Sequence, residues 1–132
     1  MNWREQAVCA SVDSEPWFPE QVTPYDEAFR LCVSCPVQRE CLKFSFDNRE
    51  EFGIWGGVGP SLRLELLPKY VRRGMKDRVT MLASLMGRVN AEITALWDEV
   101  EANRVAALGR QRERTAVLRR SRRERLGAGR AA

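Results

Sequence analysis

Four cysteines constrain the fold of this chain more than any other feature. Cys32, Cys35 and Cys41 lie within ten residues, and with Cys9 they give the pattern C-x22-C-x2-C-x5-C. Thiolates are soft ligands that favour zinc, copper(I) or an iron–sulfur cluster, so this spacing predicts one four-ligand site. Two alternatives stay open: two disulfides in any of three pairings, or four unrelated buried thiols.

The expected compartment favours a metal or a cluster over permanent disulfides. The N-terminal segment lacks the apolar core of a signal peptide, and no apolar run reaches the length of a bilayer span. We therefore expect a cytoplasmic protein with no membrane association, and disulfides in that compartment are usually transient. The chain contains no histidine, which excludes Cys2His2 zinc sites and histidine-based acid–base catalysis.

Helix signals predict an all-α fold around the cysteines. We expect a short helix over residues 3–9, then a loop with a turn over residues 13–16. Thr23 is suited to cap a helix that runs to about Cys32, and Pro36 is suited to open the next helix. This arrangement would bring three cysteines to one centre, with the fourth reaching it from the loop.

A glycine-rich turn follows over residues 53–60. Four glycines permit positive φ angles and close approach of the backbone. Trp55 lies within it, either as a core residue of a tight loop or as an anchor offered to a partner. Nine of the eleven aromatic residues precede residue 61, which predicts an apolar core or jacket around the cysteine site.

The second half of the chain has a different character. Residues 1–60 carry a net charge of −5, whereas residues 61–132 carry +9. Apolar residues at alternating steps of four and three predict a long helix with one seam, formed by Met75, Val79, Leu82, Met86, Val89, Ile93, Leu96 and Val100. This 75–100 seam would either pair two copies into a dimer or fold back on the first domain.

The last segment is rich in arginine. Residues 110–132 hold nine arginines and two glutamates. We predict DNA contact because the planar guanidinium binds two phosphate oxygens together, with a solvated, flexible end as the alternative. The expected contacts are Arg119, Arg120, Arg122, Arg123 and Arg125. The predicted domains are residues 1–67 for the cysteine site, 68–109 for the helical extension and 110–132 for the flexible basic tail.

Over residues 3–60 the sequence resembles the WhiB-like family of actinobacteria and their phages. The resemblance is carried by Trp3-Arg4, Ala7-x-Cys9, Asp13, Trp17-Phe18-Pro19, the cysteine core and Gly53-Ile54-Trp55-Gly56-Gly57. It implies a 4Fe–4S cluster held by all four cysteines and responsive to oxygen and nitric oxide. It also implies a transcription regulator that binds region 4 of the primary sigma factor of RNA polymerase. Trp55 with Gly53, Gly56 and Gly57 would form that contact.

Two other functions compete with this interpretation. The first is a zinc-stabilised DNA-binding protein with the same four ligands. The second is a thiol–disulfide oxidoreductase that uses Cys32 and Cys35 as a C-x2-C pair. That motif normally lies in a βαβ context, and the sequence lacks an alternating strand pattern. We therefore expect a regulator rather than an enzyme.

Overall fold

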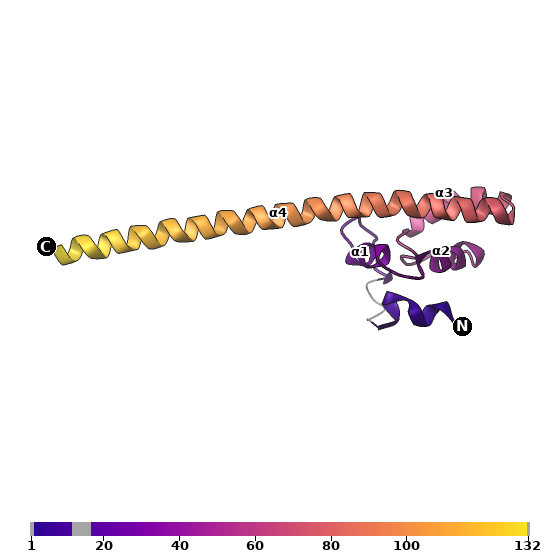
Figure 1. Cartoon of the computed structure of the whole chain (residues 1–132), viewed down its shortest axis with the longest axis horizontal. Coiled ribbons are helices and arrows are strands. Elements are labelled where there is room, and N and C mark those ends of the chain that lie inside the picture. Colours follow the sequence, from indigo (N-terminus) through magenta and orange to yellow (C-terminus); the bar gives the residue numbers. More distant parts are fainter. Residues whose placement is uncertain (1, 12–16, 132) are drawn as a thin grey trace. The chain divides into compact units, whose positions relative to one another are not determined.

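The computed structural model describes residues 2–11 and 17–131, and this part of the chain is helical (Figure 1). The elements in order are the 3-10 helices η1 (Trp3–Gln6) and η2 (Val8–Ser11) and the α-helices α1 (Glu27–Val33), α2 (Gln38–Asp47), α3 (Pro60–Arg72) and α4 (Met75–Ala131). Within the described residues the β structure is a single bridge between Trp55 and Val58. The predicted all-α class is therefore confirmed. Asp13 and the turn predicted over 13–16 lie outside the described residues.

The helices around the cysteines begin later than predicted. Asp26, and not Thr23, is the N-cap of α1, because residues 23–26 form a turn of their own. The Asp26 N–H donates to the Thr23 carbonyl at 3.1 Å, and the Thr23 N–H donates to the Asp26 carboxylate at 2.6 Å. Likewise α2 begins at Gln38 rather than at Pro36. The segment predicted as a short helix over 3–9 forms two 3-10 helices instead.

The main core joins α2, α3 and the first part of α4. Its buried residues are Leu42, Phe46, Val58, Leu66, Tyr70, Leu82, Leu85 and Val89. Residues 82–93 of the predicted seam thus fold back on the first domain, whereas Met75 and Val79 remain exposed. Pairing of two copies through the rest of the seam stays a prediction.

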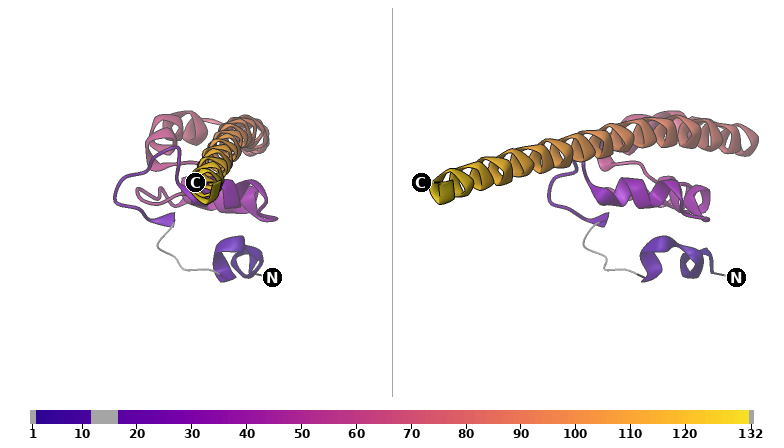
Figure 2. Two further views of the ribbon diagram at one scale, coloured as in Figure 1. Left: turned by 90° about the vertical axis from the view of Figure 1, so that its left-hand side faces the viewer. Right: turned by 60° about the vertical axis from the view of Figure 1, so that its left-hand side comes forward.

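The chain divides into two compact units, Met1–Ala95 and Leu96–Ala132. In the first unit, α1 and α2 lie between the N-terminal 3-10 helices and the pair formed by α3 and the start of α4 (Figures 1 and 2). The second unit is the remainder of α4.

Two predicted domain limits fall within helices. Helix α3 continues past residue 67 and contains Pro68, and α4 continues past residue 109. The segment for which we predicted flexibility, 110–132, is helical up to residue 131. Alanine, arginine, leucine and glutamate dominate it, and these residues have high helix propensity. In the described part of the chain no helix combines the length and the apolar character that a bilayer span requires.

Candidate metal centre

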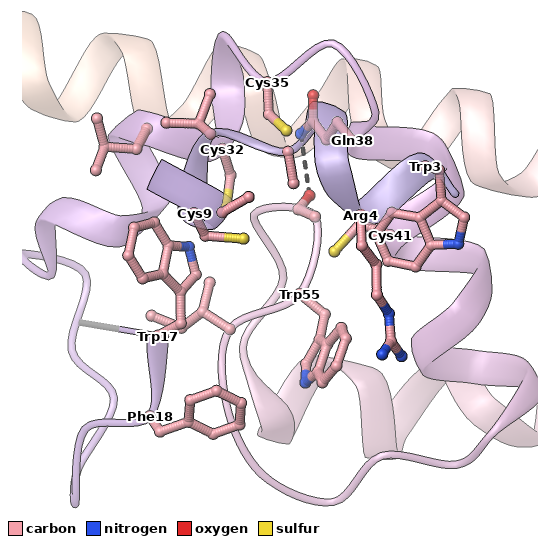
Figure 3. A pocket seen from close by; sticks show the side chains of 16 residues that line it. Trp3, Arg4, Cys9, Trp17, Phe18, Cys32, Cys35, Gln38, Cys41 and Trp55 are labelled. Atoms are coloured by element: carbon pink, nitrogen blue, oxygen red, sulfur yellow. Dashed lines mark hydrogen bonds between the residues drawn. The ribbon is translucent and has the colours of Figure 1, made fainter. Parts of the chain in front are cut away.

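All four cysteines line one cavity of about 310 Å³ in the first unit. Cys9 comes from η2, Cys32 from the last turn of α1, Cys35 from the following loop and Cys41 from α2. Their side chains point toward the same space (Figure 3), and all four are free thiols. Cys32 is buried, Cys35 and Cys41 are half-buried and Cys9 is exposed. The convergence expected from the spacing is therefore observed.

Burial in the cavity favours the protonated form of three of the thiols, Cys9, Cys32 and Cys41. Burial raises the pKa of Cys32 to about 11, although hydrogen bonds from the Trp17 side chain and the Gly57 backbone partly oppose this. Burial likewise raises the pKa of Cys41 to about 12, opposed by the Gly56 backbone. The pKa of Cys9 is also raised, by burial and then by the charge of Cys35. A metal or a cluster must displace these protons, because only the thiolate is a ligand.

The glycine turn supplies backbone donors to two of the thiols. The backbone of Gly56 hydrogen-bonds Cys41, and that of Gly57 hydrogen-bonds Cys32. Both glycines have positive φ, at 59° and 80°, and the Trp55–Val58 bridge closes the turn. Hydrogen bonds to cysteine sulfurs are among the groups that set the reduction potential of an iron–sulfur cluster. The predicted turn is thus confirmed, and it belongs to the wall of the cysteine site.

Trp55 is half-buried and forms part of the same wall. Its ring stacks on Phe44 at a centroid distance of 5.6 Å and meets Phe18 edge-on at 6.2 Å. Its indole N–H donates to the carbonyl of Phe52 at 2.8 Å. The guanidinium of Arg4 covers the Phe44 ring at 4.4 Å. Trp55 therefore has packing contacts within the fold and also keeps an accessible surface.

Arg63 supports the turn, and sequence reasoning missed it. Its side chain is 2% exposed, and its guanidinium donates to four backbone carbonyls. These belong to Val58 at 2.6 Å, Gly53 at 2.7 Å, Phe52 at 3.0 Å and Glu50 at 3.2 Å. Burial lowers the pKa of Arg63 to about 10. In the sequence, an arginine within a leucine-rich stretch gives no sign of this contact.

A second unpredicted contact joins the site to α4. Gln38, which lines the cavity, donates from Nε2 to the Gly56 carbonyl at 3.0 Å and to Asn90 Oδ1 at 2.6 Å. Asn90 Nδ2 donates in return to Gln38 Oε1 at 3.0 Å. The two residues are 52 positions apart, so no local pattern could have paired them.

Four cysteine thiols on one cavity form a donor set of the kind that holds an iron–sulfur cluster or a zinc ion. A tetrahedral zinc site with Zn–S bonds of about 2.3 Å places its sulfurs about 3.8 Å apart. Within residues 2–11 and 17–131, no three Cys, Asp or Glu side chains approach closely enough to hold one ion. All four cysteines line one cavity, and four thiolates are the donor set that an iron–sulfur cluster requires.

The arginines predicted to contact DNA lie in the second unit. Arg119, Arg120, Arg122, Arg123 and Arg125 are all exposed on α4. Exposure leaves their guanidinium groups accessible to a polyanion.

Comparison with known proteins places residues 3–66 in a family described as "Transcription factor WhiB". The chain is 42% identical over 66 residues to the transcriptional regulator WhiB of Streptomyces coelicolor. The aligned residues cover 50% of this chain and 76% of that protein. It is 41% identical over 65 residues to WhiB2 of Mycobacterium tuberculosis, covering 49% and 73%. It is 32% identical over 77 residues to WhiB1 of the same species, covering 54% and 92%.

Proposed function

The chain belongs to the WhiB family of transcription factors, and on that basis we propose that it is a regulator built around a 4Fe–4S cluster. Cys9, Cys32, Cys35 and Cys41 would hold the cluster. The observation that carries this proposal is that all four cysteines line one cavity of about 310 Å³. When bound, the cluster would supply a group that reacts with oxygen or nitric oxide.

The protein's own residues would tune and protect that group. Backbone groups of Gly56 and Gly57 hydrogen-bond two of the sulfurs and would stabilise their negative charge. Trp17 and Trp55 line the same cavity and would restrict water there. Four ligands from η2, α1, the loop after α1 and α2 would also tie these segments together, so loss of the cluster should loosen the first unit.

We further propose that Trp55 contacts region 4 of the primary sigma factor, on a turn whose shape the buried Gly53, Gly56 and Gly57 determine. Large aromatic residues with a rigid backbone are favoured as anchors at protein interfaces. Trp55 is held by Phe44 and Phe18 and keeps an accessible surface. Loosening of the first unit would then change how this turn is presented, which would link the cluster to transcription.

DNA contact through the basic end of α4 completes the proposal. The exposed arginines at 119, 120, 122, 123 and 125 would neutralise phosphates, and the released counterions would make binding weaken with salt. Deletion of residues 110–132 should therefore reduce the slope of log affinity against log salt. An unchanged slope would assign DNA contact to another part of the chain.

The cluster is tested by anaerobic purification with visible spectroscopy and with iron and sulfide assays, in the presence of sigma region 4. The wild-type chain should contain iron and sulfide in equal amounts, and Cys→Ala variants at 9, 32, 35 and 41 should lose them. Ser34→Ala, adjacent to Cys35, is the matched control and should retain both. A full content of zinc without sulfide would instead support the zinc-stabilised DNA-binding protein.

A further inference from the structure

One peptide unit connects helix α4 to the thiol of Cys32. Gln38 donates to the carbonyl of Gly56, and the N–H of the same peptide unit belongs to Gly57. Gly57 lies beside Cys32, since a Cβ atom on Gly57 would lie 3.6 Å from the Cys32 Cβ, and its backbone partly opposes the rise in the pKa of that thiol. Because a peptide unit is planar, fixing the direction of its carbonyl also fixes the direction of its N–H. The hydrogen bond from Gln38 to the Gly56 carbonyl therefore fixes the direction of the Gly57 N–H, on the side of Cys32.

The Gly56 carbonyl and Asn90 together hold the Gln38 amide in one orientation. A primary amide has two donor hydrogens and one acceptor oxygen. Gln38 directs Nε2 to both Gly56 and Asn90, and its Oε1 accepts from Asn90. In the flipped orientation Oε1 would face the Gly56 carbonyl, two acceptors together, and both bonds to Asn90 would be lost. Gln38 is 3% exposed, so water has little access to replace them.

We propose that Asn90 is a positioning residue for the cysteine site, acting through Gln38 on the Gly56–Gly57 peptide unit. Asn90 lies outside the segment that matches the family, so this contact couples the site to the chain's own C-terminal extension. The coupling is reciprocal: whatever stabilises the peptide unit at the sulfur also stabilises the turn of α4 that carries Asn90. The part that concerns the cluster rests on the proposed function.

The first test follows the Gly57 amide and requires no cluster. In the cofactor-free full chain, its hydrogen-exchange rate should rise at least about fivefold in Asn90→Ala and in Asn90→Leu. Leucine has a branched side chain of similar shape and favours the helix more than asparagine does, but it removes both hydrogen bonds. It therefore separates the loss of the hydrogen bonds from the loss of side-chain volume in alanine. Asn103→Ala, an exposed asparagine on the same helix, is the control and should leave the rate unchanged. Wild-type exchange at Gly57 in Asn90→Leu, with unchanged helix content, overturns the proposal.

The second test follows the cluster in the anaerobically loaded chain. Cluster loss to a chelator should be about tenfold faster in both Asn90 variants, as for other residues that orient metal ligands. The midpoint potential should shift in the same variants and stay constant in Asn103→Ala. If the wild-type chain binds no cluster, the proposed function fails, yet Gly57 exchange still decides whether Asn90 positions the turn.

A double-mutant cycle identifies the path. In a Gln38→Leu background, Asn90→Ala should add no further increase in Gly57 exchange, because the amide that it orients is absent. Equal effects of Asn90→Ala in both backgrounds would mean that Asn90 acts without Gln38, which overturns the proposal.

Discussion

The guanidinium of Arg63 lies 2.7 Å from the carbonyl oxygen of Gly53, ten residues earlier in the chain. Three further carbonyls, those of Val58, Phe52 and Glu50, accept from this one side chain. The turn has little regular backbone pairing of its own beyond the Trp55–Val58 bridge. The Arg63 side chain comes from α3, and its hydrogen bonds therefore stabilise the turn that places the Gly56 and Gly57 backbone next to the thiols.

Substitution of Arg63 should destabilise the turn and the site together. Arg63→Lys keeps a positive charge, but a single ammonium group cannot reach four carbonyls at once. We expect a loss of about 3 kcal/mol in the free energy of unfolding, because buried acceptors lose their donor. Urea unfolding of the full chain, monitored by circular dichroism, measures this loss. Arg72→Lys, at an exposed position of the same helix, should change stability by less than about 0.5 kcal/mol. Equal stabilities of the two variants would contradict this role for Arg63.

The contact between Tyr70 and Asp47 should make stability depend on pH. The Tyr70 hydroxyl donates to Asp47 at 2.6 Å. Burial alone would raise the pKa of Asp47, but hydrogen bonds from Lys43 and Tyr70 outweigh it and hold the pKa below its usual 3.8. A carboxyl group with a depressed pKa contributes stability above pH 3.8 and loses it as the pH falls through the folded value.

Tyr70→Phe should therefore lower the free energy of unfolding most at neutral pH. We expect a deficit of about 1 kcal/mol at pH 7, reduced from the value for a buried charged pair because Asp47 is partly exposed. The deficit should shrink as the pH falls below 3.8 and through the lower folded pKa of Asp47, below which the carboxyl is protonated in both proteins. Thermal or urea unfolding between pH 7 and pH 3 measures it, with Tyr25→Phe, an exposed tyrosine, as the control. A deficit that does not change with pH would attribute the effect to packing alone.

Local sequence patterns predicted the parts of the site that local chemistry determines. The cysteine spacing placed Cys32, Cys35 and Cys41 on a helix end, a loop and the next helix, as observed. The glycines required a turn with positive φ, and the structure has one. The start of α1 was predicted wrongly because Thr23 resembles an N-cap, whereas its bonds with Asp26 form a separate turn.

The contacts that support the site from a distance could not be predicted. In the sequence, Arg63 is a single charged residue in a leucine-rich segment. Carbonyls from residues 50–58 surround its side chain only in the folded chain. Gln38 and Asn90 meet because α4 folds back on α2 and the turn. Neither contact follows a periodic sequence pattern, because each joins segments that meet only in the folded chain.

Gly56 should tolerate no side chain. Its φ is +59°, and a Cβ atom there would lie 2.8 Å from both the Gln38 carbonyl and the Leu42 Cβ. Gly56→Ala should therefore displace the turn from α2, and we expect a loss of about 2 kcal/mol or more from strain and lost packing. Urea unfolding measures the loss. Gly87→Ala is the control, because nothing lies near that position and alanine favours its helix, so stability should be kept or raised. Wild-type stability in Gly56→Ala would show that α2 moves aside at little cost.

Trp55 offers the sharpest test of the link between the site and transcription. Its ring contacts Phe44 and Phe18 and lines the cysteine cavity, yet the residue is only half-buried. If Trp55 anchors sigma region 4, Trp55→Ala should weaken binding by about thirtyfold or more, as for a buried aromatic anchor at an interface. Binding is measured by titration with sigma region 4 on the same sample whose cluster absorbance is recorded.

The two measurements on that sample separate the roles of Trp55. Weak sigma binding with intact cluster absorbance supports an interface contact, because the wall of the cavity then tolerates the loss of the indole. Loss of the cluster absorbance would make Trp55 a structural residue of the cavity, held there by Phe44 and by its bond to the Phe52 carbonyl. Tyr25→Ala removes an exposed aromatic residue that does not line the cavity, and it should leave both the cluster and sigma binding unchanged. Unchanged binding in Trp55→Ala with the cluster intact would exclude Trp55 from the interface.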